Sequence, residues 1–598
     1  MPIINFQLYK RLHIWRLRHI SESTFITILS IVVGLLSGLA AVALKTAVHK
    51  ISSFLLSIGY QLPNVNHQLS IILYPIVGIA LTVVFVCYIL RKPIGHGIPN
   101  VLLAISRHKG KLPSRNMYGS LIASSLTVGF GGSVGLEAPI ASTGSAIGSN
   151  IGRLCRLQPK HIKMLLGCGA AGAIAGIFKA PLAGILFVVE VYLFDLTKTS
   201  AIPLLLSSIS ATTVAYFLMG SDVEFAFSVI EDFQLSQIPF YIVLGICCAL
   251  SSIYFLRVTD KVEGLFSRIH SPWLKMLIGG VLLSLLILVF PPLFGEGYGT
   301  LTALLNGKEP HLLADFIVPT LSAQLLPFIL LILILLKTVA TAVTIGSGGV
   351  GGTFGPSLII GGLTGYMVAC LSNLLGLPPQ STANFALVGM AAVMAGVMHA
   401  PLMATFLIAE ITGGYALMAP LLISVAVTYL CVNPFEKHSI YARKLALHGD
   451  LLTHDKDQSA WQLLDMHKLI ETNFISLRKG DNVHQLLHAI EDSHRNIFPV
   501  LTSDDKFLGV IHLDDVRKII FKPQYYDTFH VEDLMSKLTE GDIVHLEDSL
   551  SDVVDKFRLG PDKYNLVVLD KDENYLGFLS RANTFSAYRR FISASSEE

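Results

Sequence analysis

An isolated acidic residue, Glu137, is the first feature of this sequence that could do chemistry. It is the only charged residue between Arg115 and Arg153. A carboxylate in apolar sequence at membrane depth costs about 2.5–3.5 kcal/mol on insertion scales, so such residues tend to mark a transport path. Glycines nearby let backbone approach a small ligand, and Pro139 suits the first turn of a helix, whose free N–H groups attract anions. The segment therefore predicts an anion pathway that a proton-sensitive carboxylate closes.

The amino-acid composition places this segment in a membrane protein. Only 14% of the 598 residues are charged, and the mean hydropathy is +0.61. Residues 338–409 contain no Asp, Glu, Lys or Arg, whereas the chain beyond 450 has the charge density of a soluble protein. We therefore predict a large membrane region followed by a soluble region of about one domain's length. The net charge of +2 gives no indication of nucleic-acid binding.

The apolar segments that must position Glu137 fall into two classes. A spanning helix needs about 20 apolar residues, and the better candidates are Thr24–Val48, Leu69–Leu90, Ile202–Met219, Pro239–Leu256, Met276–Phe294 and a short one, Leu325–Leu336. The others are shorter and broken by Gly or Pro: 118–132, 139–152, 164–178, 181–194, 356–374, 384–398, 401–413 and 418–433. Such segments are tolerated at membrane depth only where they are buried in protein or line a cavity. The pattern predicts an all-α membrane domain with many broken helices.

An internal repeat relates the two halves of the membrane region. With a shift of 220 residues, the segment Ala180-Pro181-Leu182 matches Ala400-Pro401-Leu402, and Glu190 matches Glu410. With a shift of 217, Gly135 and Pro139 match Gly352 and Pro356. Corresponding Gly/Pro-interrupted segments point to the binding site of a transporter-like fold. We expect Glu190 and Glu410, at equivalent positions, to cap neighbouring backbone rather than to bind an ion.

The soluble region contains two similar α/β units, which predict a pair of small mixed sheets. The first has strands at Phe474–Leu477, Ile497–Leu501 and Leu508–Ile511, with helices near 483–492 and from 513. The second has strands at Ile543–Leu546, Asn565–Leu569 and Tyr575–Leu579, with helices near 549–558 and from 581.

These motifs, in this order, resemble the CLC family of chloride channels and chloride/proton exchangers, and the soluble pair resembles two CBS modules. The family's first anion motif is similar to Gly95-His96-Gly97-Ile98-Pro99, its second to Gly135-Leu136-Glu137-Ala138-Pro139, its third to Gly352-Thr353-Phe354-Gly355-Pro356, and its pore tyrosine to Tyr441. The resemblance implies a CLC-type inverted repeat whose helix starts hold a dehydrated chloride through partial charges. It assigns the first and third motifs and Tyr441 to chloride binding and Glu137 to gating. Core packing for Phe354 and an interfacial anchor for Tyr441 are the alternatives.

Two departures from the family pattern bear on function. His96 stands where the family often has a serine that touches the ion, and a histidine can become cationic near neutral pH. Either His96 makes anion affinity acid-sensitive, or its ring turns away and only its backbone N–H binds. Val191 stands at the position of the internal glutamate that carries protons in exchangers. That replacement is the pattern of the family's channels, although some exchangers lack the glutamate.

The CBS pair offers an incomplete pattern for binding an adenine nucleotide. The family's ribose-binding pattern places a hydroxyl residue before an acid. The first module has His512 and Asp515, and the second has Ser580 and Asn583, so each copy keeps a different half of the pattern. Nucleotide binding and a purely structural, dimerising role both stay open.

The resemblance also implies a domain organisation and a location. A cytoplasmic segment, 1–23, precedes a transmembrane domain, 24–435, with repeat halves of about 24–220 and 238–435; a linker, 436–465, leads to CBS modules at 466–525 and 530–590. Basic residues before the first span place the N-terminus in the cytoplasm by the positive-inside rule, and the CBS modules lie on the same side. We expect a homodimer with one pore per subunit in a bacterial inner membrane.

The sequence thus predicts chloride permeation gated by protonation or displacement of Glu137, with a channel favoured over a chloride/proton antiporter. A CBS-regulated cation transporter is a distant alternative, because hard cations want several carboxylates and the membrane core offers few. An enzyme would need paired catalytic groups in the apolar spans, and the sequence shows none. We expect no metal site and no required cofactor; chloride, with or without protons, is the transported ligand.

Overall fold

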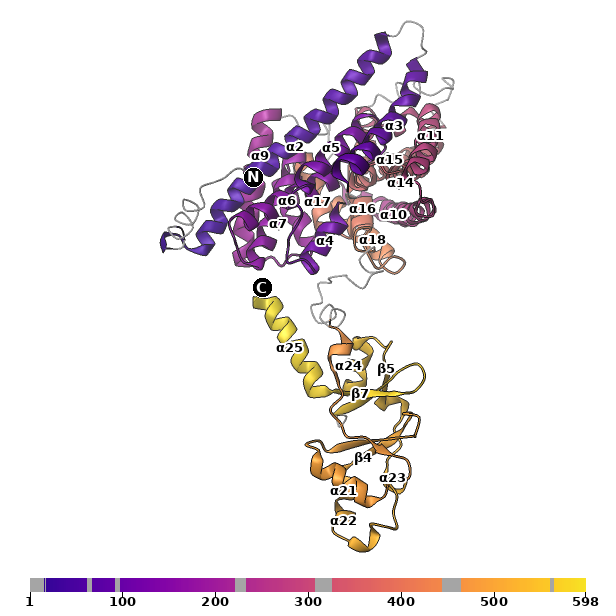
Figure 1. Cartoon of the computed structure of the whole chain (residues 1–598). Helices are drawn as coiled ribbons and strands as arrows, with labels where there is room; N and C mark the ends of the chain where they lie inside the picture. The colour runs from indigo at the N-terminus through magenta and orange to yellow at the C-terminus, as the bar shows by residue number, and fades with distance from the viewer. Residues whose placement is uncertain are drawn as a thin grey trace. The chain divides into compact units, whose positions relative to one another are not determined.

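The computed structural model (Figure 1) describes residues 16, 18–61, 67–91, 97–220, 233–306, 325–412, 414–443, 464–559 and 564–597. The chain divides into two compact units, Met1–His448 and Gly449–Glu598. The described part of the first unit is helical, and all the described strands lie in the second. This agrees with the predicted helical membrane domain and α/β tail.

The first repeat half carries helices α2 to α9. Their bounds are α2 (Glu22–Gln61), α3 (His67–Val84) continued by a π-helical turn (Phe85–Leu90), α4 (Ile98–Ser106), α5 (Asn116–Gly129), α6 (Glu137–Leu154), α7 (Pro159–Phe178), α8 (Pro181–Glu190) and α9 (Lys198–Met219). The second half carries α10 (Ile238–Ser267), α11 (Pro272–Val289), α12 (Tyr298–Leu305), α14 (Leu326–Gly346), α15 (Phe354–Leu374), α16 (Thr382–Met398), α17 (Pro401–Ile411) and α18 (Met418–Val432), with short 3₁₀ turns at Leu235–Gln237 and Pro291–Leu293.

The two repeat halves share the contacts between their helices as well as the order of the helices. Helix α6 packs against α7 as α15 packs against α16, and α2 contacts α9 as α10 contacts α18. The close crossings use equivalent glycines. A Cβ on Gly144 would stand 2.1 Å from the carbonyl oxygen of Gly169, and one on Gly361 would stand 2.3 Å from that of Gly389. Neither crossing leaves room for a side chain. The same close packing of helices therefore occurs in both halves.

Eight helices in the described part of the chain are long and apolar enough to cross a bilayer. They include α7 and α15, which the sequence had placed among the short, broken segments. Helix α7 starts five residues before the apolar run, at a proline in the first turn, so a polar beginning hid its length. Helix α14 extends beyond the predicted end at Leu336, because Lys337 is buried in it and donates hydrogen bonds to protein partners.

The second unit contains two sheets. The strands are β1 (Ile470–Glu471), β2 (Leu477–Arg478), β3 (Ile497–Leu501), β4 (Phe507–His512), β5 (Ile543–His545), β6 (Asn565–Leu569) and β7 (Tyr575–Ser580). The sheet orders are β2-β3-β4 and β1-β7-β6-β5. In each, a parallel pair (β2–β3, β5–β6) is followed by an antiparallel pair (β3–β4, β6–β7) with the same register shift near its end. The two halves of the second unit are therefore structural copies of each other.

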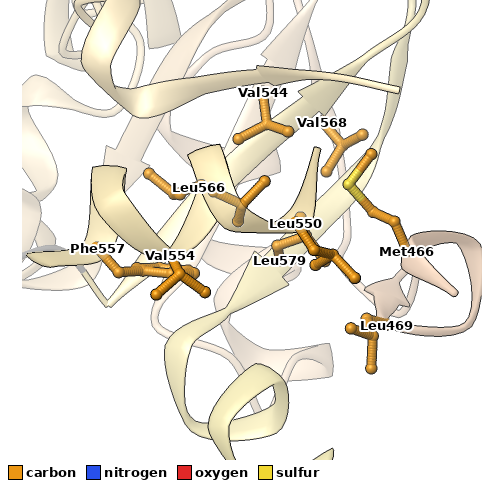
Figure 2. Close-up of a cluster of buried hydrophobic side chains, with 10 residues drawn as sticks. Met466, Leu469, Val544, Leu550, Val554, Phe557, Leu566, Val568 and Leu579 are labelled. Atoms are coloured by element: carbon orange, nitrogen blue, oxygen red, sulfur yellow. The ribbon is translucent and has the colours of Figure 1, made fainter. Parts of the chain in front are cut away.

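Helices cover these sheets and complete two cores. They are α21 (Val483–Asp492), α22 (Leu513–Ile520), α23 (Val531–Leu534), α24 (Leu550–Leu559) and α25 (Arg581–Glu597), with 3₁₀ turns at Met466–Lys468, Pro523–Tyr525 and Glu540–Asp542. Figure 2 shows the core of the second copy, where Phe557 of α24 packs with Val544 and Leu566 of the sheet. Met466 and Leu469 join this core, so the start of the predicted first module packs with the second sheet. The strand predicted at Phe474–Leu477 is wrong except for its last residue, because Phe474 packs against Phe578 instead.

Candidate anion site

Equivalent glycines of the two repeat halves meet at the centre of the membrane unit. The amide of Gly135 donates to the carbonyl of Gly352 at 2.8 Å, and the amide of Gly352 donates back to Gly135 at 2.7 Å. This isolated antiparallel bridge joins the segments that lead into α6 and α15. The second and third motifs, more than 200 residues apart in sequence, therefore start their helices side by side.

The Glu137 carboxylate lies in the space between these helix starts. Glu137 is the first residue of α6 and is only 1% exposed. One carboxylate oxygen, Oε2, accepts the backbone N–H of Gly355 at 3.1 Å, and the other, Oε1, accepts the hydroxyl of Tyr298 at 2.5 Å. A Cβ on Gly135 would stand 2.2 Å from Oε2. The glycines are therefore what leaves room for an anionic group, and the carboxylate occupies that room.

The described part of the first motif packs against the start of α6, the helix that begins with Glu137. Gly97 has φ +56°, which favours glycine, and its Cβ position lies 3.3 Å from the carbonyl oxygen of Ala138. Ile98 is buried at the start of α4, and Pro99 follows within the first turn. Gly95 and His96 lie outside the described residues, so the proposed acid sensitivity of His96 stays a prediction.

Tyr441 and Thr353 contribute two buried hydroxyls to the same region. Both side chains are buried, and neither hydroxyl makes a well-aligned hydrogen bond in the part of the chain that the structure describes. The two hydroxyls are close enough to interact with each other, and Glu137 and Tyr192 lie within electrostatic range of the Tyr441 hydroxyl. Because buried hydroxyls normally find partners, these two are available as donors to an anion.

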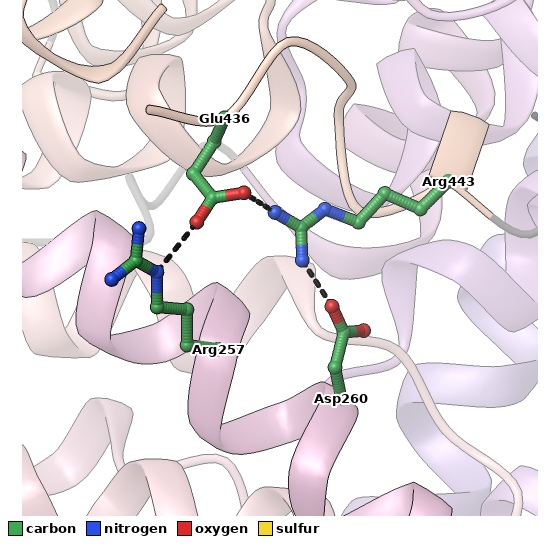
Figure 3. Close-up of polar contacts among 4 residues, drawn as sticks. All are labelled: Arg257, Asp260, Glu436 and Arg443. Atoms are coloured by element: carbon green, nitrogen blue, oxygen red, sulfur yellow. Dashed lines mark hydrogen bonds and ion pairs between the residues drawn. The ribbon is translucent and has the colours of Figure 1, made fainter. Parts of the chain in front are cut away.

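An ion network holds the segment that carries Tyr441 (Figure 3). Glu436 binds both Arg257 of α10 and Arg443, and Arg443 also binds Asp260 of α10. The amide of Ile440 donates to the carbonyl of Val397, at the end of α16, at 3.2 Å. The tyrosine therefore sits on a segment tied to two helices, although no regular element contains it.

Two further predicted positions, Phe354 and Val191, are buried in the membrane unit. Phe354, the first residue of α15, is buried with its ring 5.6 Å from that of Phe178, so the side chain packs in the core while the backbone starts the helix. Val191 is buried at the end of α8. The next residue, Tyr192, is buried as well, and its hydroxyl is 3.1 Å from the hydroxyl of Ser145 on α6.

Glu190 and Glu410 cap each other's repeat half, as the sequence predicted. Glu410 at the end of α17 accepts the amides of Leu182 and Ala183 at the start of α8, both at 2.9 Å. Glu190 at the end of α8 accepts the amides of Leu402 and Met403 at the start of α17, at 3.0 and 2.7 Å. The carboxylates satisfy amides that have no partner within their own helices.

Sequence reasoning missed Tyr298, whose hydroxyl donates to the Glu137 carboxylate. A signal was present, since Gly295-Glu296-Gly297-Tyr298 repeats the pattern of Gly95-His96-Gly97-Ile98 exactly 200 residues on. In the structure these segments precede the equivalent helices α12 and α4. The other missed residue is Lys337, which is buried and donates to the Ser133 hydroxyl and the Gly295 carbonyl, both at 2.8 Å.

The candidate nucleotide residues lie at equivalent strand-to-helix junctions of the two CBS-like units. His512 and Asp515 are exposed at the end of β4 and the start of α22. Ser580 ends β7, and its hydroxyl accepts the backbone amide of Asn583 at 3.3 Å. Tyr575 lies where the copies share a core, and burial raises the pKa of its phenol. The hydroxyl of Ser580 thus caps a helix, and nucleotide binding stays a prediction.

Comparisons with known proteins agree with this geometry. Residues 78–433 match the family described as voltage gated chloride channel, and residues 466–522 match the CBS domain. A putative chloride channel protein, ClcB-like, of Ralstonia nicotianae is 29% identical over 361 residues, which are 59% of this chain and 80% of that protein. The H(+)/Cl(-) exchange transporter ClcA of Vibrio vulnificus is 28% identical over 446 residues, 72% of this chain and 91% of that protein.

A solved structure with the same fold is that of a slow cyanobacterial Cl⁻/H⁺ antiporter. It superposes with a TM-score of 0.62 at 26% identity and covers 71% of this chain and 97% of that one. The family match spans more than half of the chain and contains the bridged glycines, Glu137 and Tyr298. This chain is therefore a multi-pass membrane protein of the CLC family of anion transporters, with a CBS region at its C-terminus.

Proposed function

We propose that the protein exchanges chloride for protons, with Glu137 as both the gate and the proton carrier. The observation that carries this proposal is the place of the carboxylate, held by the Gly355 amide and the Tyr298 hydroxyl where the motifs of both repeat halves meet. An ionised carboxylate there fills an anion site. Protonation, or displacement by chloride, releases it and leaves the donors to the transported ion. One group thus couples the two ions.

The channel indicated by Val191 has less support than the antiporter. One relative carries a channel name, but another, of which this chain covers 91%, is named as an exchanger, and a structure with the same fold is that of an antiporter. An exchanger without an acid at position 191 needs another polar route for protons. The Tyr192–Ser145 hydroxyl pair is next to Val191 in the chain and within electrostatic range of Tyr441. We assign the inner proton route to this pair.

The coupling is tested with purified protein in lipid vesicles. An outward chloride gradient, with the membrane potential clamped, drives protons uphill through an exchanger and leaves internal pH unchanged with a channel. Val191→Glu should keep or raise proton flux, whereas Tyr192→Phe should lower the number of protons moved per chloride. A reversal potential that follows the chloride gradient alone at every pH would exclude exchange and would support a channel instead.

The assembly and location remain part of the proposal. We propose a homodimer with one pathway per subunit in a bacterial inner membrane, with the N-terminus and the CBS pair in the cytoplasm. Mass measurement in detergent tests the dimer. Calorimetric titration of the full chain with ATP, compared with Asp515→Ala, tests whether the CBS pair binds a nucleotide.

A further inference from the structure

The residue that holds the Glu137 carboxylate opposite Gly355 belongs to a segment that no motif includes. Tyr298 starts α12 and is partly buried, and its hydroxyl donates to Oε1 of Glu137 at 2.5 Å. A Cβ on Gly355 would stand 3.2 Å from the Tyr298 hydroxyl and 3.2 Å from Oε1. The hydroxyl, the amide and the carboxylate therefore share one small space.

The segment before Tyr298 is built to hold it there. Gly295 and Gly297 have φ values of +62° and +96°, a conformation that favours glycine. The amide of Gly295 donates to the carbonyl of Gly131 at 3.1 Å, and its carbonyl accepts from Lys337. Lys337 also donates to Ser133. The tyrosine segment is thus fastened at two points to the glycine segment that carries Glu137.

The repeat explains why this segment reaches the ion path. Helix α12 is the counterpart of α4 in the second half, and the Gly-x-Gly patterns before both helices end in a left-handed glycine, Gly297 and Gly97. An inverted repeat places equivalent segments on opposite sides of the centre. The Gly97 segment packs on one side of the first turn of α6, at Ala138. The Gly297 segment is the equivalent segment of the second half, and the residue that follows Gly297, Tyr298, carries a hydroxyl.

We propose that Tyr298 is a ligand of the outer part of the ion path, with two alternating partners. In the closed state its hydroxyl holds the ionised Glu137 carboxylate. When the carboxylate leaves, the same hydroxyl and the Gly355 amide donate to the anion that takes its place. Tyr298 therefore sets both the pH at which the gate opens and the affinity of the site that it vacates. This inference rests on Glu137 acting as the gate but not on proton coupling.

The sign of the pH effect follows from the hydrogen bond. The hydroxyl stabilises the ionised carboxylate, so its removal favours the protonated, open gate. Among the described residues, Tyr441 after α18 lies within electrostatic range of Glu137, and Lys337 of α14 binds the segment that carries Glu296 and Tyr298. None of them is altered by a change at Tyr298 to Phe, which keeps the ring.

The test is chloride flux from vesicles as a function of pH for Tyr298→Phe. A hydrogen bond to a charged group is strong enough that its loss should move the half-maximal pH upward by about one unit. Tyr118→Phe removes an exposed hydroxyl on α5 and serves as the matched control, with no expected shift. An unchanged pH profile in folded Tyr298→Phe protein would overturn the proposal.

A second measurement separates the effect of Tyr298 on the Glu137 gate from its effect on anion binding. In a Glu137→Gln background the pH dependence is already gone, so adding Tyr298→Phe should cause no pH shift but should weaken chloride binding several-fold in calorimetric titration. Unchanged chloride affinity there would remove the anion-ligand role. If vesicle experiments find no proton transport, the proposed exchange fails, yet the pH shift and the affinity loss still decide the role of Tyr298.

Discussion

Each repeat half has one carboxylate, Glu190 or Glu410, that accepts backbone amides of the other half. Removal of one of these carboxylates should destabilise the contact between the two halves. In Glu190→Ala the amides of Leu402 and Met403 lose acceptors at 3.0 and 2.7 Å. Neither amide has a replacement in its own helix, because both lie in the first turn of α17. The change therefore exposes two backbone donors to apolar surroundings, where an unsatisfied group is costly.

The size of this effect can be worked from the bonds. A hydrogen bond to a charged acceptor contributes about 1.5–3 kcal/mol, and the partly exposed position of Leu402 reduces one of the two. We expect Glu190→Ala to lower the free energy of unfolding by about 3 kcal/mol and Glu190→Gln, which keeps one carbonyl acceptor, by about half of that.

The repeat supplies the matched control. Glu410→Ala removes acceptors at 2.9 Å from Leu182 and Ala183, so it should cost about the same. Denaturant unfolding of the purified protein in detergent micelles, with chloride flux measured in parallel, gives both values. Wild-type stability in Glu190→Ala, or a large loss at one position and none at the other, would refute the reasoning.

Three further changes act on the site itself. Glu137→Gln should leave a pathway that conducts chloride at every pH and moves no protons, because the side chain can no longer carry charge; paired chloride and proton flux measurements check this. Gly135→Ala should lower chloride flux at every pH, since the new methyl would stand 2.2 Å from the position of Oε2 and 2.8 Å from the Gly355 amide nitrogen and so fill the room for an anion. Arg443→Ala should weaken chloride binding measured by calorimetry without changing the pH profile, because it loosens the segment that holds Tyr441 but leaves Glu137 in place.

The meeting of the second and third motifs was predictable because both motifs lie at the starts of helices. Gly135 and Gly352 are related by the repeat, and a repeat that inverts in the membrane brings equivalent starts to one centre. The capping role of Glu190 and Glu410 followed from the same relation. In each case backbone amides are the partners, and the sequence of glycines and prolines fixes where those amides are free.

Side-chain partners far from a motif could not be predicted in this way. The shift between repeat halves is 217 to 220 residues around the anion motifs but only 200 at Tyr298, because the connections before α5 and α14 differ in length. A fixed shift therefore hides the second Gly-x-Gly segment. The end of α14 was missed for a different reason: a lysine inside an apolar run indicates a helix end unless its partners, Ser133 and the Gly295 carbonyl, are known.

The contacts of the site imply that neither repeat half can form it alone. The carboxylate comes from the first half, while the donors Gly355 and Tyr298 come from the second. The glycine bridge and both carboxylate caps also run from one half to the other. These contacts of the Glu137 carboxylate thus cross the repeat boundary. A shift of one half against the other would break the contacts of the carboxylate, the bridge and the caps together, so we expect a rotation of its side chain to release Glu137 at a lower cost than a rotation of the halves.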